Sequence, residues 1–477
     1  MEMTVPRVPP CELADATALR EQIAQGQFNG EKLLHRHLTR LSEVQPHLHA
    51  ASAVLREEAM RQWDEAPSGP LSGLPCSIKE TIGIAGQPIR AGSNFMRPWV
   101  PARDAQVVTR LKAAGAIVVA RGNVPEFAMT AEMASPRHGI ARNPLDLDRA
   151  AGGASGGDAA LVASGAVAFG IGTDILGSIR IPAAFCGLVG FKPASDAVPK
   201  QGCWPRIKGF TDSWQAIGPI CRSVRDVRLV YQVLAQTVLP EVPSLGCSRL
   251  IEADEFPLQS LSPCIDQAWR TARAALIAAG MHSETQHFDE AAPLYDQIKS
   301  MILYDMQADW YRALNSGGQP FSLLIESWRQ LTGRPGINRG LFEWLLYGAT
   351  LGRFAIPHSA EQAERVVERF QTVRELYREI LGNDGILLLP TMGLLAPGHG
   401  EMNRRILRPG FNRQISPLAL CNYADLPAIV VPAWSFADPA SGLPPSLMLA
   451  ASPGQEARLL AAAETVERSV NPLRAAI

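Results

Sequence analysis

The sequence predicts an α/β fold, because stretches typical of β-strands alternate along the chain with stretches typical of helices. Between residues 69 and 240, short β-branched runs such as 117–119 alternate with helical patterns such as 105–114, and glycine-rich turns separate them. Further along, the runs 386–389 and 428–431 are continuously hydrophobic, which is the pattern of strands buried on both faces. No low-complexity linker separates the two regions, so we expect their strands to share one sheet.

The pattern divides the chain into four segments. Residues 1–68 have helical apolar spacing, which predicts an N-terminal helical layer, and residues 69–240 carry the alternating strands and helices of the core. Residues 262–382 have the pattern of amphipathic helices rich in large aromatic residues, and we expect this insertion to cover a pocket. Residues 384–477 return to strands and end in a helix. We therefore interpret 1–477 as a single discontinuous domain.

The composition is that of an ordinary globular chain, and it predicts neither binding to a nucleic acid nor a membrane span. Of the 477 residues, 47% are hydrophobic and 19% are charged, which excludes collagen, coiled-coil and wholly disordered classes. With a net charge of −1, the chain lacks the excess of basic residues that is typical of proteins that bind nucleic acids. The longest uncharged stretches, such as 385–400 and 439–455, contain glycine and proline and are shorter than the about 18 apolar residues of a membrane span.

The cysteines and histidines predict reduced cysteine thiols and neither a metal site nor a cofactor site. The 8 cysteines are scattered and include no C-x-x-C pair, so we interpret them as reduced thiols of a cytoplasmic protein. The N-terminus places acids and prolines where an export signal would need a basic start and an apolar run. No metal-ligand spacing and no dinucleotide fingerprint occurs, so we expect neither a metal nor a cofactor.

A glycine-rich region contains the best candidate for a nucleophile. The segment 151–158 reads A-G-G-A-S-G-G-D, and 172–182 reads G-T-D-I-L-G-S-I-R-I-P. Ser178 follows a glycine-rich turn, where a hydroxyl can lie beside several backbone N–H donors, as an oxyanion hole requires. The alternative is a plain turn. The region lacks the P-loop pattern, and no G-x-S-x-G spacing surrounds Ser178.

A serine nucleophile needs a base, and Lys79 is the better candidate than any histidine. Of the 9 histidines, four lie in the polar N-terminal region, and His138 alone lies between the candidate strands and the glycine-rich segment. Lys79 instead ends the apolar run 74–78, and a lysine among apolar groups loses the hydration of its charged form and becomes available as a neutral base. The alternative is a lysine at a strand end that extends to water. The residues thus favour a serine–lysine system.

Five motifs in order resemble those of the amidase signature family. They are G-L-P-C-S-I-K-E at 73–80, G-N-V-P-E-F-A at 122–128, N-P-L-D-L-D-R at 143–149, G-G-A-S-G-G at 152–157 and G-T-D-I-L-G-S-I-R-I-P-A-A-F-C-G at 172–187. The resemblance covers roughly residues 70–230 and returns weakly at 422–432. It implies hydrolysis of a carboxylic amide through an acyl-enzyme, and an amidase-signature fold with a mixed central sheet wrapped by helices.

The family's functional residues fall on defined positions of this chain. The resemblance implies that Ser178 is the nucleophile, Lys79 the base, and Ser155 the second hydroxyl of the glycine-rich loop. Asp174 and Arg180 would be supporting polar groups around the nucleophile turn. The oxyanion donors would be the backbone N–H groups of Ile175, Leu176, Gly177 and Ser178.

Three positions depart from the family pattern: Ala154, Leu176 and Glu80, where the family often has Asp, a change that we expect to matter little. The family's G-G-S-S-G-G has a relay serine, held in a cis peptide, where this chain has Ala154, and an alanine can neither donate nor accept a proton. Three interpretations remain open: Ser155 or a water bridges Lys79 and Ser178, a deliberate Ser→Ala change holds a substrate, or the protein is a non-catalytic relative. Leu176 replaces a glycine, and we expect it to narrow the pocket.

The function predicted from the sequence is hydrolysis of a small or medium-sized neutral amide with an aryl or alkyl acyl part. The chain as written is then impaired or traps its substrate, because Ala154 replaces the relay serine. The alternatives are the A subunit of a glutamyl-tRNA amidotransferase and a catalytically silent amide-binding relative. We expect a small-molecule amide substrate, no nucleic acid and no membrane, with a homodimer as an open alternative.

Overall fold

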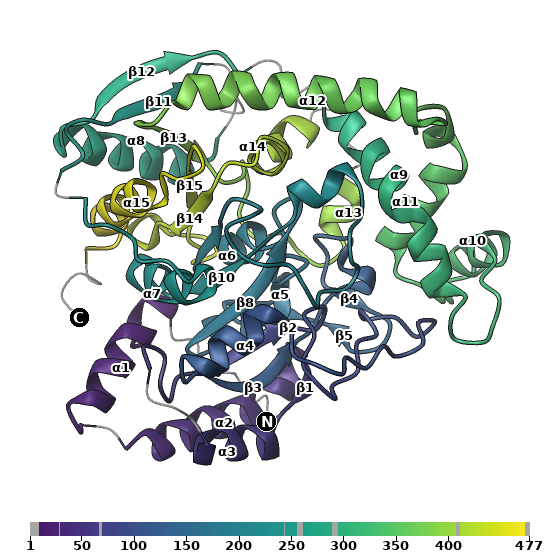
Figure 1. Ribbon diagram of the computed structural model, residues 1–477, viewed down its shortest axis with the longest axis horizontal. Helices are drawn as coiled ribbons and strands as arrows, with labels where there is room; N and C mark the ends of the chain where they lie inside the picture. The colour runs from purple at the N-terminus through teal and green to yellow at the C-terminus, as the bar shows by residue number, and fades with distance from the viewer. Residues whose placement is uncertain are drawn as a thin grey trace.

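The computed structural model describes residues 9–472 apart from 28, 66–68, 243, 255–260, 289–293 and 407–410. In this part of the chain, eleven strands form one mixed sheet in the order β1-β3-β2-β8-β10-β9-β14-β15-β13-β11-β12 (Figure 1). The expected α/β fold with a mixed sheet is confirmed. In chain order the strands are β1 (Ala51–Val54), β2 (Pro75–Lys79), β3 (Ile117–Gly122), β8 (Phe169–Asp174), β9 (Val189–Lys192), β10 (Ala216–Cys221), β11 (Arg249–Ala253), β12 (His282–Gln286), β13 (Gly385–Pro390), β14 (Ala428–Pro432) and β15 (Ser446–Ala451).

The direction of the strands places two chain segments at one edge of the sheet. Strand β2 is parallel to both of its neighbours, β3 and β8, whereas β10 is antiparallel to β8 and to β9. Parallel neighbours end at the same edge of a sheet. The last residues of β2 and β8 therefore come together. Two short hairpins, β4 (Ala134–Ser135) with β5 (Gly139–Ile140) and β6 (Arg142–Asn143) with β7 (Asp146–Ala150), lie outside this sheet.

Helices cover both faces of the sheet. One face packs against α1 (Ala16–Ala24), α4 (Gln106–Ala113), α7 (Val224–Ala235), α8 (Pro263–Ala278) and α15 (Glu456–Val470). The other face packs against α2 (Gly30–Leu48), α3 (Arg56–Glu65) and α5 (Gly156–Ala163) over one half, and against α6 (Arg180–Phe185), α12 (Ala360–Leu381) and α14 (Phe411–Tyr423) over the other. The two covers explain why the strands are hydrophobic throughout rather than alternating.

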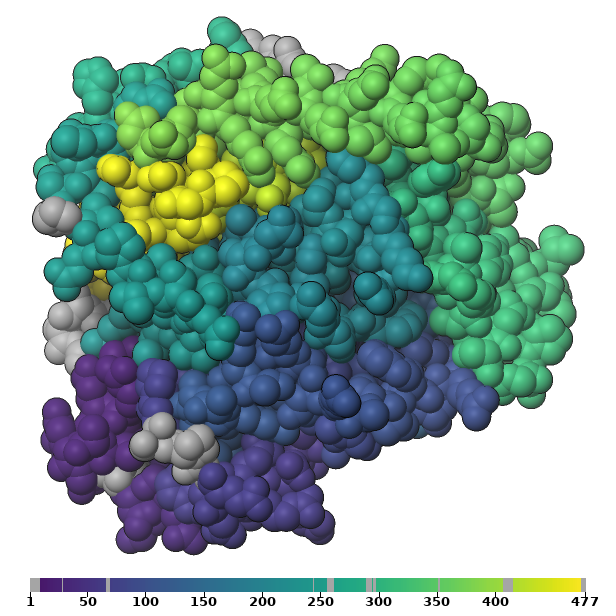
Figure 2. Space-filling view, viewed as in Figure 1, coloured from purple at the N-terminus to yellow at the C-terminus, as the bar shows by residue number. Residues whose placement is uncertain are grey.

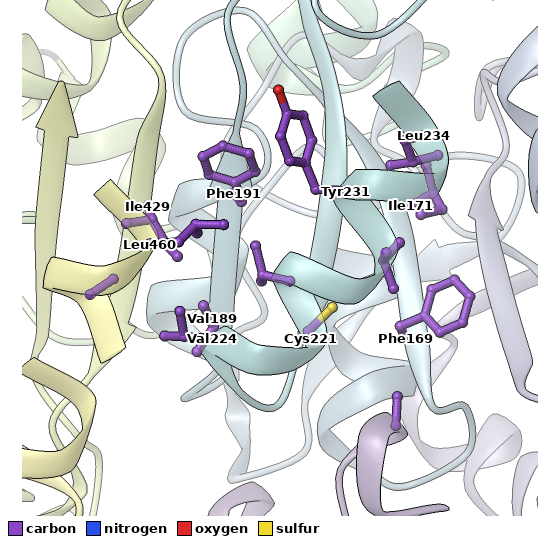
Figure 3. Packing of buried hydrophobic residues seen from close by; sticks show 14 of the residues in the cluster. Phe169, Ile171, Val189, Phe191, Cys221, Val224, Tyr231, Leu234, Ile429 and Leu460 are labelled. Carbon is purple, nitrogen blue, oxygen red and sulfur yellow. The ribbon is translucent and has the colours of Figure 1, made fainter. Parts of the chain in front are cut away.

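Strand β13 shows this double burial directly. Ile386 and Leu388 belong to the cluster under α8 and α15, whereas Leu387 and Leu389 face the opposite cluster. Successive side chains of a strand point to opposite faces, so both sets are removed from water. Figure 3 shows the first cluster where β9, β14, α7 and α15 meet, with Phe191 close to Tyr231 at a ring-centroid distance of 5.0 Å.

The N-terminal and insertion segments differ in detail from their sequence pattern. Residues 1–68 contain the edge strand β1 besides α1, α2 and α3. In 262–382, α8 packs on α15 and β12 pairs with β11, so this part belongs to the sheet. Strand β12 reads H-S-E-T-Q, which lacks apolar alternation because it is the outermost strand.

The remaining helices of the insertion form one side of the molecule. These are α9 (Tyr295–Leu314), α10 (Leu323–Leu331) and α11 (Arg339–Ala349), and α12 leads from them back to the sheet (Figure 1). In Figure 2 the green surface of these helices borders the blue surface of residues from the N-terminal half of the chain. Across the described ranges, no helix combines the length and the apolar character that a membrane crossing requires.

Candidate active site

The ends of β2 and β8 bring Lys79 close to the residues that lead into the turn with Ser178. Lys79 is the last residue of β2, and Thr173 and Asp174 are the last two residues of β8. The side-chain nitrogen Nζ of Lys79 donates to Thr173 Oγ1 at 2.9 Å and to the Thr173 carbonyl oxygen at 3.3 Å. Ser178 follows Thr173 by five residues and is half-buried.

The surroundings of Lys79 lower its affinity for a proton. Its side chain is fully buried. Burial disfavours the charged form and lowers the pKa of Lys79 to about 8, although Asp158 and Asp174 act in the opposite direction. Burial also lowers the pKa of Lys192 to about 8, but Lys192 lies on β9, separated from β8 by β10. Of these two buried lysines, Lys79 is the one that donates hydrogen bonds to Thr173 on β8.

The turn that carries Ser178 is wrapped around one carboxylate. Asp174 Oδ1 accepts a hydrogen bond from the backbone N–H of Gly177 at 2.7 Å, and Oδ2 accepts one from that of Ile179 at 3.1 Å. Gly177 has φ +103°, a left-handed conformation that a side chain would disfavour. The carboxylate thus fixes the backbone on both sides of Ser178.

Arg180 compensates the charge of Asp174 and ties the turn to the C-terminal part of the chain. Its Nε and Nη2 donate to the two Asp174 oxygens, each at 3.0 Å, and both side chains are fully buried. Arg180 Nη2 also donates to Asn422 Oδ1 at 2.7 Å, and Asn422 Nδ2 donates to Asp174 Oδ1 at 3.0 Å. Burial alone would raise the pKa of Asp174, but Arg180 and Asn422 hold it well below its usual range.

The four expected oxyanion donors are not equivalent. The N–H of Gly177 already donates to Asp174. The N–H groups of Ile175, Leu176 and Ser178 form no hydrogen bond within the described residues. These three remain available to a ligand oxygen, whereas Gly177 serves the turn itself.

The loop at Ala154 places a methyl group where a hydroxyl is expected. Ala154 is fully buried, and the peptide bond between Gly153 and Ala154 is cis. The backbone N–H of Ser155 donates to the Ser178 carbonyl oxygen at 3.1 Å, and Ser155 Oγ donates to the Thr173 carbonyl oxygen at 3.4 Å. Ser155 Oγ and Lys79 Nζ thus share one acceptor.

A cavity of about 220 Å³ lies in front of Ser178. Its inner wall is mostly apolar and comes from the 128–131 segment and from the serine turn. Its outer wall comes from α9, α11, α13 (Glu401–Ile406) and α14. The lining residues are Ala128, Met129, Thr130, Ala131, Gly153, Ile175, Leu176, Ser178, Ile181, Lys299, Gly340, Glu343, Trp344, Tyr347, Met402, Asn403 and Ile415.

The aromatic residues of the insertion divide between the cavity and the core. Trp344 and Tyr347 line the cavity, and Trp310 packs behind Trp344 at a ring-centroid distance of 6.1 Å. Trp328, in contrast, is exposed on α10. Leu176 lines the cavity from the opposite side, on the serine turn.

Sequence patterns assigned no role to two residues that complete the site, Thr173 and Asn422, although both stand in segments that resemble the family. Thr173 stands next to the expected Asp174 in the quoted motif. Its position was therefore visible in the sequence, but its hydrogen bond with Lys79 was not. Asn422 is 248 residues from Asp174. No local pattern joins them. Among the residues that the structure describes, no group of three or more His, Cys, Asp or Glu side chains is arranged to hold a metal ion.

We predict that Arg180→Met strongly destabilises the protein. The substitution leaves the Asp174 carboxylate buried without its cation, which typically costs about 3–5 kcal/mol. Urea unfolding followed by circular dichroism measures the change, and Asp174→Asn combined with Arg180→Met should recover part of it. Equal stability of Arg180→Met and wild type would show that the turn does not depend on this ion pair.

The chain is similar to known proteins over most of its length. The family model described as Amidase matches residues 32–460. The A subunit of the glutamyl-tRNA(Gln) amidotransferase of Roseiflexus castenholzii is 30% identical over 482 residues, which cover 94% of this chain and 94% of that protein. A solved amidase structure superposes with a TM-score of 0.80 at 25% identity, covering 96% of this chain and 100% of that one. A structure of 6-aminohexanoate cyclic dimer hydrolase has a TM-score of 0.81 at 23% identity, covering 97% and 98%. The chain therefore belongs to the amidase signature family and is an amidohydrolase.

Proposed function

We propose that this amidohydrolase cleaves a small or medium-sized neutral amide through an acyl-enzyme on Ser178, with Lys79 as the base. The observation that carries the proposal is the meeting of β2 and β8. It places a buried lysine, with a pKa of about 8, beside the strand that leads into the serine turn. Ser178 in turn lines the cavity.

The reaction begins with attack of Ser178 Oγ on the amide carbon. The proton of the Ser178 hydroxyl passes to neutral Lys79. The N–H groups of Ile175, Leu176 and Ser178 donate hydrogen bonds that stabilise the negative charge forming on the amide oxygen. The protonated Lys79 then returns the proton to the leaving nitrogen, so the C–N bond breaks and the amine departs. Water hydrolyses the acyl-enzyme by the same proton path.

The proton needs a bridge between Ser178 and Lys79, and we assign it to a water molecule beside Ala154. Ser155 is the alternative bridge, but its hydroxyl is directed to the Thr173 carbonyl oxygen and would have to leave that acceptor. A water is less firmly held than a serine hydroxyl, so the chain acylates slowly. A deliberate Ser→Ala replacement that traps substrate would give the same arrangement.

The lining of the cavity favours an aryl or alkyl acyl group. Ile175, Leu176, Ile181 and Trp344 line the cavity together with Ser178. A cavity of about 150 Å³ is enough to bind benzene. The present cavity of about 220 Å³ suits a substituted ring or a short alkyl chain.

A second candidate is the A subunit of a glutamyl-tRNA amidotransferase. It is supported by the 30% identity to the Roseiflexus castenholzii protein over 94% of both chains. The apolar wall around Ser178 favours the stand-alone amidase, because a glutamine side chain offers little apolar surface to bury there. Purification from the native cells decides between them, since a component of an amidotransferase would co-purify with other chains.

We predict that Ala154→Ser accelerates acylation of Ser178 by about 10²- to 10⁴-fold, which is the usual contribution of one acid–base group. Intact-mass spectrometry after timed exposure to a fluorophosphonate measures the rate, and Ser178→Ala is the control that should not react. Equal rates for wild type and Ala154→Ser would contradict the bridging role of position 154. No adduct in either protein would identify a catalytically silent relative.

We predict that Ala154→Ser hydrolyses neutral aryl and short alkyl primary amides. Adding Leu176→Gly should lower KM for bulkier acyl groups, because the leucine side chain narrows the cavity. Ammonia release from a panel of neutral and anionic amides measures both effects. Hydrolysis of anionic amides alone would contradict the assignment of an apolar acyl pocket.

A further inference from the structure

Asp158 is a fully buried carboxylate that the steps above do not use. It is the third residue of α5, directly after the glycine-rich loop, and its side chain enters the space between α5 and the sheet. Glycines on the neighbouring strands provide that space. A Cβ at Gly122 would lie 2.2 Å from Asp158 Oδ2, and one at Gly170 would lie 3.0 Å from Asp158 Cβ. Strands β3 and β8 therefore leave room for this carboxylate.

The carboxylate lies on the Lys79 side of strand β2. Ser77 Oγ donates to Asp158 Oδ1 at 2.7 Å. Ser77 precedes Lys79 by two residues, so both side chains leave the strand on the same face. Asp158 Oδ2 has no hydrogen-bond partner within the described chain. The charge of this oxygen is therefore balanced through space rather than by a direct hydrogen bond.

Three ionisable groups face Lys79: Asp158, Asp174 and Cys203. Asp174 is already paired with Arg180. Burial raises the pKa of Cys203 to about 12, so its thiol is neutral. Asp158 is the remaining negative neighbour of the lysine.

Two cations face Asp158, namely Lys79 and Arg121. The guanidinium of Arg121 donates to the carbonyl oxygens of Pro88, Glu80 and Ile82. These acceptors hold it at the end of β3, and it makes no hydrogen bond to Asp158. Lys79 is thus the cation near Asp158 that can change its charge during a reaction.

We propose that Asp158 is the counter-charge of Lys79, a positioning residue that keeps this lysine basic enough to take the Ser178 proton. The inference rests on the proposed role of Lys79 as the base. When Lys79 receives the proton it becomes a fully buried cation, and a fixed carboxylate stabilises that cation. The proton moves from Ser178 to Lys79 and then to the leaving amine, and Asp158 keeps its charge throughout.

The ionisation of Asp158 is compatible with this role. Burial raises the pKa of Asp158 to about 7, and the Ser77 hydrogen bond and Lys79 limit the rise. The carboxylate is therefore ionised above about pH 7, which includes the range in which Lys79 loses its proton.

The test is a direct titration of Lys79 by NMR of protein labelled with ¹³C at the lysine Cε. The chain has only 7 lysines, and Lys79→Arg assigns the signal. We predict that Asp158→Asn lowers the titration midpoint of Lys79 by about 1 pH unit, because a nearby opposite charge has been removed. Lys192 is the internal control. Its charged neighbours are Asp425, Arg180 and Asp174, so its midpoint should not move.

An unchanged Lys79 midpoint in Asp158→Asn would overturn the proposal. Asp158→Ser is the second variant, and failure of both to fold would assign Asp158 a purely structural role. The pH dependence of fluorophosphonate labelling, measured in the Ala154→Ser background, separates this inference from the proposed function. A shifted NMR midpoint with an unshifted labelling profile would contradict Lys79 as the base and leave the contact between Lys79 and Asp158 intact.

Discussion

The carboxylate of Asp174 joins two distant parts of the chain that the active site needs, the serine turn and the segment around Asn422. It accepts hydrogen bonds from a backbone N–H of the serine turn, from the guanidinium of Arg180 and from the side-chain amide of Asn422. A buried carboxylate is costly unless it is paired and hydrogen-bonded, and here both of its oxygens are satisfied. The same bonds that compensate the charge also fix the position of Ser178. The C-terminal part of the chain is therefore held to the turn through Asn422.

The sheet supplies the second constraint. Lys79 and Thr173 meet because β2 and β8 are parallel neighbours, so no flexible loop stands between the base and the strand that carries the nucleophile turn. The central position of these strands also buries Lys79, and burial brings its pKa to about 8. Position and basicity thus have one physical origin. The insertion adds the outer wall of the cavity through α9 and α11.

Local sequence was informative where the chemistry is local. An apolar run that ends in Lys79 and a glycine-rich turn before Ser178 made both residues candidates, and the family motifs implied their roles. The structure brings their segments together. Asn422 begins the weakly matching segment 422–432, but its contact with Asp174 could not be predicted, because that contact depends on strands paired across more than 200 residues. Strand β12 was hidden for a different reason: an outermost strand needs no apolar face on both sides.

The Ala154 position shows the limit of a motif. The pattern revealed that a hydroxyl is missing, but only the folded structure shows that Ser155 Oγ donates to the Thr173 carbonyl oxygen. Likewise, the motif gave four equivalent backbone donors, whereas Gly177 is committed to Asp174. Hydrogen-bond direction depends on backbone geometry and is not encoded in residue spacing.

The role of Lys79 as the base is tested most directly by the pH dependence of fluorophosphonate labelling of Ser178. The labelling is measured in Ala154→Ser, with and without Lys79→Met. With Lys79 present, the rate should rise with pH through about 8, because the uncharged lysine is the form that accepts the proton. Lys79→Met should abolish that rise and slow labelling by at least about 10²-fold, whereas Lys192→Met should retain it. The same rate and the same pH dependence in Lys79→Met would contradict the assignment of Lys79 as the base.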